Sequence, residues 1–289
     1  MQSKLYIIGV ILALYNFIGD SYAQDLNHGI LQTHIYHTSV NGNDSKKVKV
    51  YLPKNYYTDN KAYPVVYFLH GANGNEKSWM EKGHILKNID SLVSHGIIEE
   101  YIYVFPNTNR YNHKYDYLLS RPKGSIEAYL DLNGSSEYSF IEELITYIDK
   151  NFRTIPLKHY RAIAGLSLGG LQSLYITANS VDIFGHIGLF SPLIYPPLTL
   201  GMYSHIYRNL ERKLNSQFAD PALNYMIMIG EDDPYYKSAY IFSELLKKNN
   251  YNFQFIPTSG GHSWDNWESY SIIFLKSLRK KFLMQLQFL

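Results

Sequence analysis

Short apolar runs alternate with longer segments of helical periodicity through most of this chain, and this alternation limits the possible folds more than any other feature. Two of the runs, 63–71 and 101–107, are almost continuously apolar, as expected of strands buried on both faces of a parallel sheet. Helical segments between such strands cover the two faces of the sheet. The sequence therefore predicts an α/β fold with a mostly parallel central sheet and helices on both faces. The predicted strands are 47–53, 63–71, 101–107, 160–167, 186–192, 224–233 and 252–262, and the predicted helices are 135–152, 168–179 and 264–283.

Segment 135–152 shows the helical period most clearly. Leu144 and Ile148 fall on the same apolar face, and Ser135 or Ser136 precedes them as a candidate N-cap. A serine side chain at that position accepts a hydrogen bond from a free N–H group of the first turn. We therefore expect one of these two serines to cap the helix.

Composition excludes several classes of protein. With 289 residues, 46% of them hydrophobic, the chain is long enough for one large domain, and no linker or repeat divides it. The net charge of +2 and the scattered Lys and Arg residues argue against a nucleic-acid partner. The absence of cysteine from the sequence excludes a thiol nucleophile, disulfide bonds and a lipid-anchored cysteine.

The first residues have the pattern of a secretory signal. Lys4 is followed by an apolar run over 5–18, and Ser21-Tyr22-Ala23 resembles a cleavage site. A membrane anchor is the alternative, but the run is short for a transmembrane helix and no positive charges follow it. We expect a signal peptide over residues 1–23, no stable membrane anchor, and a single exported domain over 24–289, in the periplasm or the medium.

Ser167 lies where a predicted strand ends and a predicted helix begins, within the stretch "AGLSLGG". A nucleophile elbow requires such a sharp turn, and side chains two positions before and after the nucleophile would collide with neighbouring backbone. Gly165 and Gly169 remove those side chains. The backbone N–H of Leu168, at the start of the helix, can then donate to an oxyanion.

A serine nucleophile needs a base and an acid, and later strand ends supply both in the order Ser, acid, His. His262 follows the glycines of "SGGHSW" and is the expected base, since no other histidine occurs after His205. Asp233 is the expected acid, with Asp232 as the alternative. The neighbouring charged residue, Glu231, is interpreted as a solvated group at the mouth of the loop.

The second oxyanion donor is expected in the loop that follows strand 63–71. Its candidate is the backbone N–H of Ala72, in the stretch "HGANG". His70 comes too early in the chain to be the base of this arrangement, so we expect it to form structural hydrogen bonds. His34 and His37 are interpreted as surface positions of a strand and not as metal ligands, because no acidic ligand pattern lies nearby.

The motifs together resemble the esterase D family of α/β hydrolases. The stretches "FLHGANGNEKSW", "AIAGLSLGGLQSLY", "GEDD" and "GGHSWDNW" carry the resemblance, which runs from about residue 34 to about residue 280. The family includes acetyl xylan and feruloyl esterases of carbohydrate esterase family one, S-formylglutathione hydrolases, trilactone siderophore esterases and mycolyl transferases. The resemblance implies the α/β-hydrolase fold, a catalytic triad of Ser167, Asp233 and His262, oxyanion N–H groups at Ala72 and Leu168, and no metal or cofactor.

The sequence departs from the family pattern in a tyrosine-rich insertion near 108–136. Its tyrosines can either stack on sugar or aromatic acyl groups or pack the insertion on the domain. The expected activity is that of an exported serine esterase, with an acetyl or feruloyl ester on a plant oligo- or polysaccharide as the substrate partner. A trilactone siderophore esterase and a catalytically inactive glycan-binding protein are the alternatives. The sequence leaves the oligomeric state open.

Overall fold

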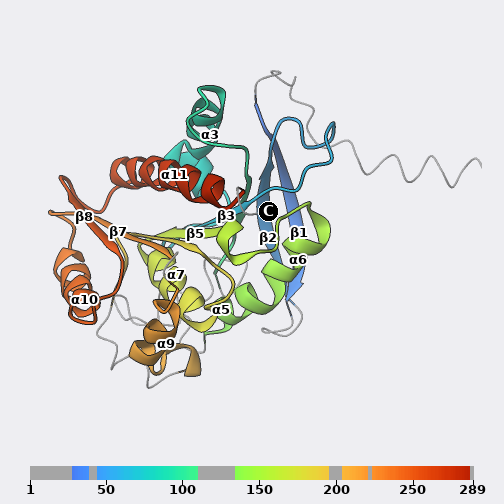
Figure 1. Ribbon diagram of the computed structural model, residues 1–289. Helices are drawn as coiled ribbons and strands as arrows, with labels where there is room; N and C mark the ends of the chain where they lie inside the picture. The colour runs from blue at the N-terminus through green and yellow to red at the C-terminus, as the bar shows by residue number, and fades with distance from the viewer. Residues whose placement is uncertain (1–27, 39–43, 110–133, 195–203, 221–222, 287–289) are drawn as a thin grey trace, which may run out of the picture.

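The computed structural model describes one mostly parallel sheet of eight strands (Figure 1), in the order β1-β2-β4-β3-β5-β6-β7-β8. Strands β3 to β8 pair in parallel, whereas β1 pairs with β2 and β2 with β4 in antiparallel fashion. The predicted fold class is confirmed. The described residues are 28–38, 44–109, 134–194, 204–220 and 223–286. The strands are β1 Ile30–Thr38, β2 Asp44–Leu52, β3 Val65–Leu69, β4 Ile102–Pro106, β5 Arg161–Leu166, β6 His186–Phe190, β7 Asn224–Gly230 and β8 Gln254–Thr258.

Helices cover both faces of the sheet (Figure 1). Helices α2, α3 and α11 pack on one face, and α6, α7, α9 and α10 contribute to the core on the other, where α5 contacts α7. Helices α2 and α3 lie between β3 and β4, where no helix is predicted from the sequence. The helices are α2 Ser78–Gly83, α3 Ile85–Ser94, α5 Ser135–Ser139, α6 Ile145–Asn151, α7 Leu168–Asn179, α9 Leu210–Gln217, α10 Tyr236–Lys248 and α11 Trp264–Leu286, with short 3-10 turns at Lys158–Tyr160 and His205–Tyr207.

The apolar run of β3 is explained by the two cores that it separates. Val65, Tyr67 and Leu69 point into the core that includes α7, whereas Val66 and Phe68 point into the core that includes α11. All five side chains are fully buried. Because successive side chains of a strand alternate between its faces, a strand covered on both sides must be apolar at every position.

The helix predicted over 135–152 forms as α5, a π-helical segment Phe140–Leu144 and α6, but the predicted cap is wrong. The N-cap residue is Gly134, with φ 71°, and the cap position makes no side-chain hydrogen bond. Ser135 and Ser136 are already inside the helix. The chain enters this helix from a left-handed conformation that glycine adopts without strain, so the position before the helix is not available to a serine cap.

His34 and His37 lie on β1, a strand that is not among those predicted from the sequence. His37 is exposed as expected, but His34 is half-buried, with its ring centroid 5.1 Å from that of Phe152. Burial lowers the pKa of His34. Within the described ranges, no group of three His, Cys, Asp or Glu side chains is arranged to hold a metal ion.

Two predicted segments fall outside the described residues. These are the signal peptide over 1–23 and most of the tyrosine-rich insertion, of which 110–133 is not described. In the part of the chain that the structure describes, no helix has both the length and the apolar character needed to cross a membrane.

Candidate active site

Ser167 lies at the sharp turn between β5 and α7. Its backbone has φ 55° and ψ −115°, a conformation that residues with a side chain rarely adopt. The flanking glycines have no room for a side chain, as the sequence predicted. A Cβ at Gly165 would lie 2.2 Å from the carbonyl oxygen of Gly169, and one at Gly169 would lie 2.5 Å from the carbonyl oxygen of His70. The turn therefore holds the serine hydroxyl at the start of α7.

The structure brings the three predicted triad side chains together at the carboxyl ends of β5, β7 and β8. His262 donates from Nδ1–H to Asp233 Oδ2 over 2.8 Å, and Ser167 donates from its hydroxyl to His262 Nε2 over 3.0 Å. The first bond leaves Nε2 as the nitrogen that can accept a proton. The Asp233 side chain is fully buried, and that of His262 is 24% exposed. The arrangement can activate the hydroxyl as a nucleophile.

The electrostatic surroundings of Asp233 suit it to the acid position. Burial alone would raise the pKa of Asp233, but hydrogen bonds from His262 and from the backbone N–H of Tyr235, at 2.9 Å, outweigh burial and lower the pKa. The ionised carboxylate can then stabilise an imidazolium ring. Asp232 is exposed, and its backbone N–H donates to Gly260 over 3.1 Å. The structure thus places Asp233, and not Asp232, against the histidine.

Aromatic rings and the loop backbone fix the position of the His262 ring. Tyr235 contacts it edge-on at 5.1 Å between centroids, and Trp267 does so at 4.8 Å. The Asn266 side chain donates to the carbonyl oxygen of Gly261 over 2.9 Å and so braces the loop. The sequence motif that contains His262 also contains Trp267, but no local pattern predicts that Trp267, Tyr235 and Asn266 position the histidine.

The two candidate oxyanion N–H groups belong to segments that border Ser167. Leu168 follows it directly, and the loop with Ala72 passes so close that a Cβ at Gly71 would lie 3.3 Å from the Cβ of Ser167. Among the residues that the structure describes, neither N–H group donates a hydrogen bond to a protein acceptor. Both are therefore available to an oxygen of a bound substrate.

His70 holds the peptide that joins Gly71 to Ala72. Its Nδ1–H donates to the carbonyl oxygen of Gly71 over 2.8 Å, and the N–H of Gly74 donates to the same oxygen over 3.0 Å. The C=O and N–H of a trans peptide point in opposite directions, so fixing the Gly71 oxygen fixes the direction of the Ala72 N–H. The expected structural role of His70 therefore includes orienting a candidate oxyanion donor.

A buried network continues from His70 to the nucleophile helix. The Nε2 atom of His70 accepts from the backbone N–H of Thr108 over 3.1 Å, and the Thr108 hydroxyl donates to Gln172 Oε1 on α7 over 2.9 Å. Burial lowers the pKa of His70, which keeps the ring neutral and Nε2 able to accept. Sequence reasoning did not find Thr108 or Gln172, because no local pattern indicates such a long-range contact.

Residues 39–270 match the sequence model of the family described as "Putative esterase". The chain belongs to this esterase family. It is 35% identical over 181 residues to an endo-1,4-β-xylanase/feruloyl esterase of Xylanibacter ruminicola, an alignment that covers 61% of this chain and 23% of that protein. It is 28% identical over 158 residues to endo-1,4-β-xylanase Y of Acetivibrio thermocellus, covering 54% of this chain and 13% of that protein. This esterase chain thus spans less than a quarter of the length of either relative.

Solved structures give the same assignment of fold. A ferulic acid esterase of carbohydrate esterase family one from Anaeromyces mucronatus superposes with a TM-score of 0.71 at 25% identity, covering 89% of this chain and 93% of that one. The S-formylglutathione hydrolase of Staphylococcus aureus gives a TM-score of 0.66 at 18% identity, covering 87% of this chain and 97% of that one. The second likeness shows the shared α/β-hydrolase fold alone.

Proposed function

We propose that this protein hydrolyses carboxylic esters by a serine acyl-enzyme mechanism and that its substrate is a feruloyl ester of a plant polysaccharide. The hydrogen-bonded array from Ser167 through His262 to Asp233 carries the proposal of mechanism. The relationship to proteins named as feruloyl esterases supports the choice of substrate over an acetyl ester or a trilactone. An inactive glycan-binding protein has less support, because the array has hydrogen-bond distances throughout.

In the proposed reaction, the Ser167 oxygen attacks the ester carbonyl carbon while His262 Nε2 takes the hydroxyl proton. The N–H groups of Ala72 and Leu168 donate to the resulting oxyanion. His262 then passes the proton to the leaving alcohol oxygen as its bond to carbon breaks, which leaves an acyl-serine. Water attacks this ester with His262 again taking the proton, and the proton returns to Ser167 as the free acid departs.

Replacing the nucleophile tests the mechanism. We expect Ser167→Ala to lower kcat on methyl ferulate by about 10⁶-fold, as loss of the nucleophile does in other triad enzymes. Ser216→Ala is the matched control, because this serine lies on α9 and its hydroxyl donates to the carbonyl oxygen of Arg212 on the same helix. Equal activity of Ser167→Ala and wild type would refute the mechanism.

The substrate is tested separately with methyl ferulate, acetylated xylan and a cyclic trilactone. We expect the largest kcat/KM for the ferulate. Preference for one of the other two compounds would contradict the substrate proposal and leave the mechanism standing.

We also propose that the protein is exported, on the basis of the signal pattern over 1–23. Expression of the full chain in a bacterium with a secretory pathway should give a mature protein that begins at Gln24. N-terminal sequencing of the exported fraction measures this, and an intact N-terminus on protein retained inside the cell would contradict it.

A further inference from the structure

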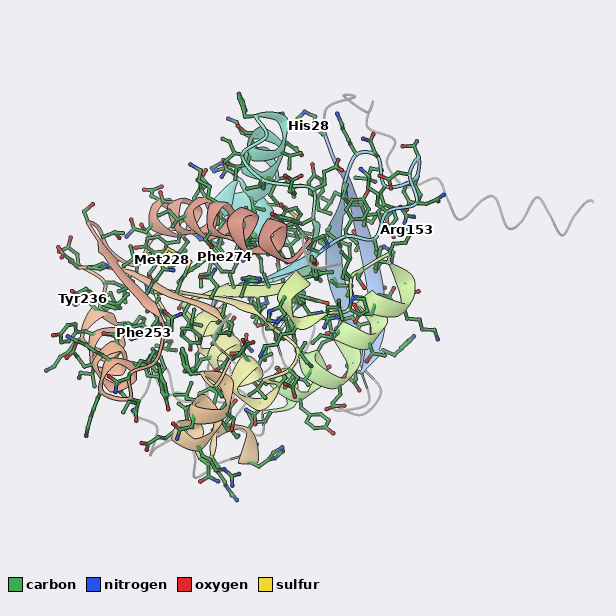
Figure 2. The ribbon with its side chains drawn as sticks, viewed as in Figure 1. His28, Arg153, Met228, Tyr236, Phe253 and Phe274 are labelled. Atoms are coloured by element: carbon green, nitrogen blue, oxygen red, sulfur yellow. The ribbon has the colours of Figure 1, made fainter. Side chains whose placement is uncertain are left out.

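Three aromatic rings lie close together where α10 packs on the edge strand β8. The rings of Tyr236 and Tyr240 are nearly parallel, 15° apart, with 6.5 Å between their centroids. Phe255 on β8 lies 6.2 Å from each of them. We call Tyr236, Tyr240 and Phe255 the α10 aromatic surface. Figure 2 shows Tyr236 beside α10, at the outer edge of the molecule.

Part of the α10 aromatic surface lies outside the buried face of the helix. The helix faces the core with Ala239, Phe242 and Leu246, which are buried. Tyr236 and Phe255 are partly buried and help to pack the helix on the edge strand. Tyr240, in contrast, remains 47% exposed, so much of its ring contacts water although it also packs on Tyr236 and Phe255.

The α10 aromatic surface begins one residue after a side chain that contacts the catalytic histidine. Tyr236 follows directly after Tyr235, whose ring contacts His262, and the N–H of Tyr236 donates to the carbonyl oxygen of Asp233 over 2.9 Å. Glu231 and Asp232, which are exposed, belong to the same loop between β7 and α10. The loop that carries Asp233 therefore leads directly into the first turn of α10, where the aromatic surface begins.

The chemistry of such a surface favours a sugar chain. The C–H groups on one face of a pyranose ring form an apolar patch that packs on an aromatic ring, while its hydroxyl groups can donate to carboxylates. The exposed charged residues next to this surface in the chain, Glu231, Asp232 and Lys237, are of both signs, so they favour neither an anionic nor a cationic polymer over a neutral one. We propose that the α10 aromatic surface binds sugar residues of the esterified glycan next to the ester that is cleaved. This inference rests on the proposed function for its choice of glycan.

Kinetics on two substrates test the proposal. We expect Tyr240→Ala to raise KM for a feruloylated arabinoxylan oligosaccharide about three- to tenfold, the range expected for loss of one aromatic contact, and to leave kcat/KM for methyl ferulate unchanged. Tyr57→Ala is the matched control: this tyrosine is 64% exposed and lies in the loop between β2 and β3, toward the opposite edge of the sheet. Equal effects of the two variants, or an equal loss on methyl ferulate, would overturn the proposal.

A binding measurement separates this proposal from the proposed function. Calorimetric titration of the full chain carrying Ser167→Ala with the unesterified arabinoxylan oligosaccharide requires no catalysis. We expect the added substitution Tyr240→Ala to weaken binding and Tyr57→Ala to leave it unchanged, even if wild type hydrolyses none of the esters. Undiminished binding in Tyr240→Ala would overturn the proposal. A wild-type dimer that Tyr240→Ala dissociates would also overturn it, because the surface would then be a contact between two copies of the chain.

Discussion

Replacing His70 by Leu should damage catalysis without displacing any triad residue. The substitution removes the Nδ1–H that binds the carbonyl oxygen of Gly71, so that, among the described residues, the N–H of Gly74 alone still holds the peptide that carries the Ala72 N–H. Complete loss of one oxyanion donor costs about 10²–10³ in kcat. Because one of the two restraints remains, we expect kcat to fall about 10- to 100-fold. KM should change little, since the oxyanion exists only in the transition state and the intermediates.

The stability of the same variant follows from the other nitrogen of the ring. Leu cannot accept from the backbone N–H of Thr108, which is buried and would be left without that partner. An unsatisfied buried donor costs about 1–3 kcal/mol. His70→Asn is the informative comparison, because its Nδ2 can replace Nδ1 toward Gly71 but its short side chain does not reproduce Nε2 toward Thr108.

Steady-state kinetics on methyl ferulate, with urea unfolding of the same preparations, distinguishes positioning from a purely structural role. We expect both variants to lose similar stability, the Leu variant to lose kcat, and the Asn variant to retain kcat close to that of wild type. Equal kcat losses in the two variants, or full activity of the Leu variant, would refute the assigned role of His70.

Other substitutions test the remaining parts of the site. Asp233→Asn should lower kcat by about 10⁴-fold, the loss seen when the acid of a Ser-His-Asp triad is made neutral. Asp232→Asn should leave kcat unchanged, and the reverse result would exchange the two assignments. Because the pKa of Asp233 is lowered in the folded state, its ionised form contributes stability that is lost as the pH falls from about 4 through the lower folded pKa. The unfolding midpoint should therefore fall less steeply with decreasing pH in Asp233→Asn than in wild type. Parallel curves for the two proteins would contradict this. Gly165→Ala places a Cβ against the backbone of Gly169 and should destabilise the fold by about 3 kcal/mol, so an unchanged thermal midpoint would show that the turn can relax.

The sequence alone was sufficient to place the three triad residues at one edge of the sheet. The order of Ser167, Asp233 and His262, each just after an apolar run, is a local pattern, and parallel strands bring their carboxyl ends to the same edge. The glycines around Ser167 could also be interpreted locally, because the steric limits of a tight turn depend on neighbours in the chain.

What sequence reasoning missed depends on contacts between distant segments. The acceptor role of His70 toward Thr108 and the contact of Tyr235 with His262 exist only once β3, β4, β7 and β8 lie in their observed order. The prediction of the helix cap failed for a related reason, since the left-handed Gly134 lies against a distant segment, where a Cβ would come within 3.0 Å of the Ile206 side chain. In contrast, α3 has a detectable signal: Ile85, Ile89 and Leu92 recur with helical spacing and are buried.

The backbone of Ser167 also bears on how this chain can change over generations. A residue with a side chain held at φ 55° and ψ −115° carries strain of about 1–3 kcal/mol, and glycine at the same position would relieve most of it. Selection for folding alone would therefore replace this serine by glycine. In descendants that no longer need the hydroxyl, we expect glycine to become fixed at position 167 before the surrounding turn is lost, so the residue found there would report whether a lineage still uses its nucleophile.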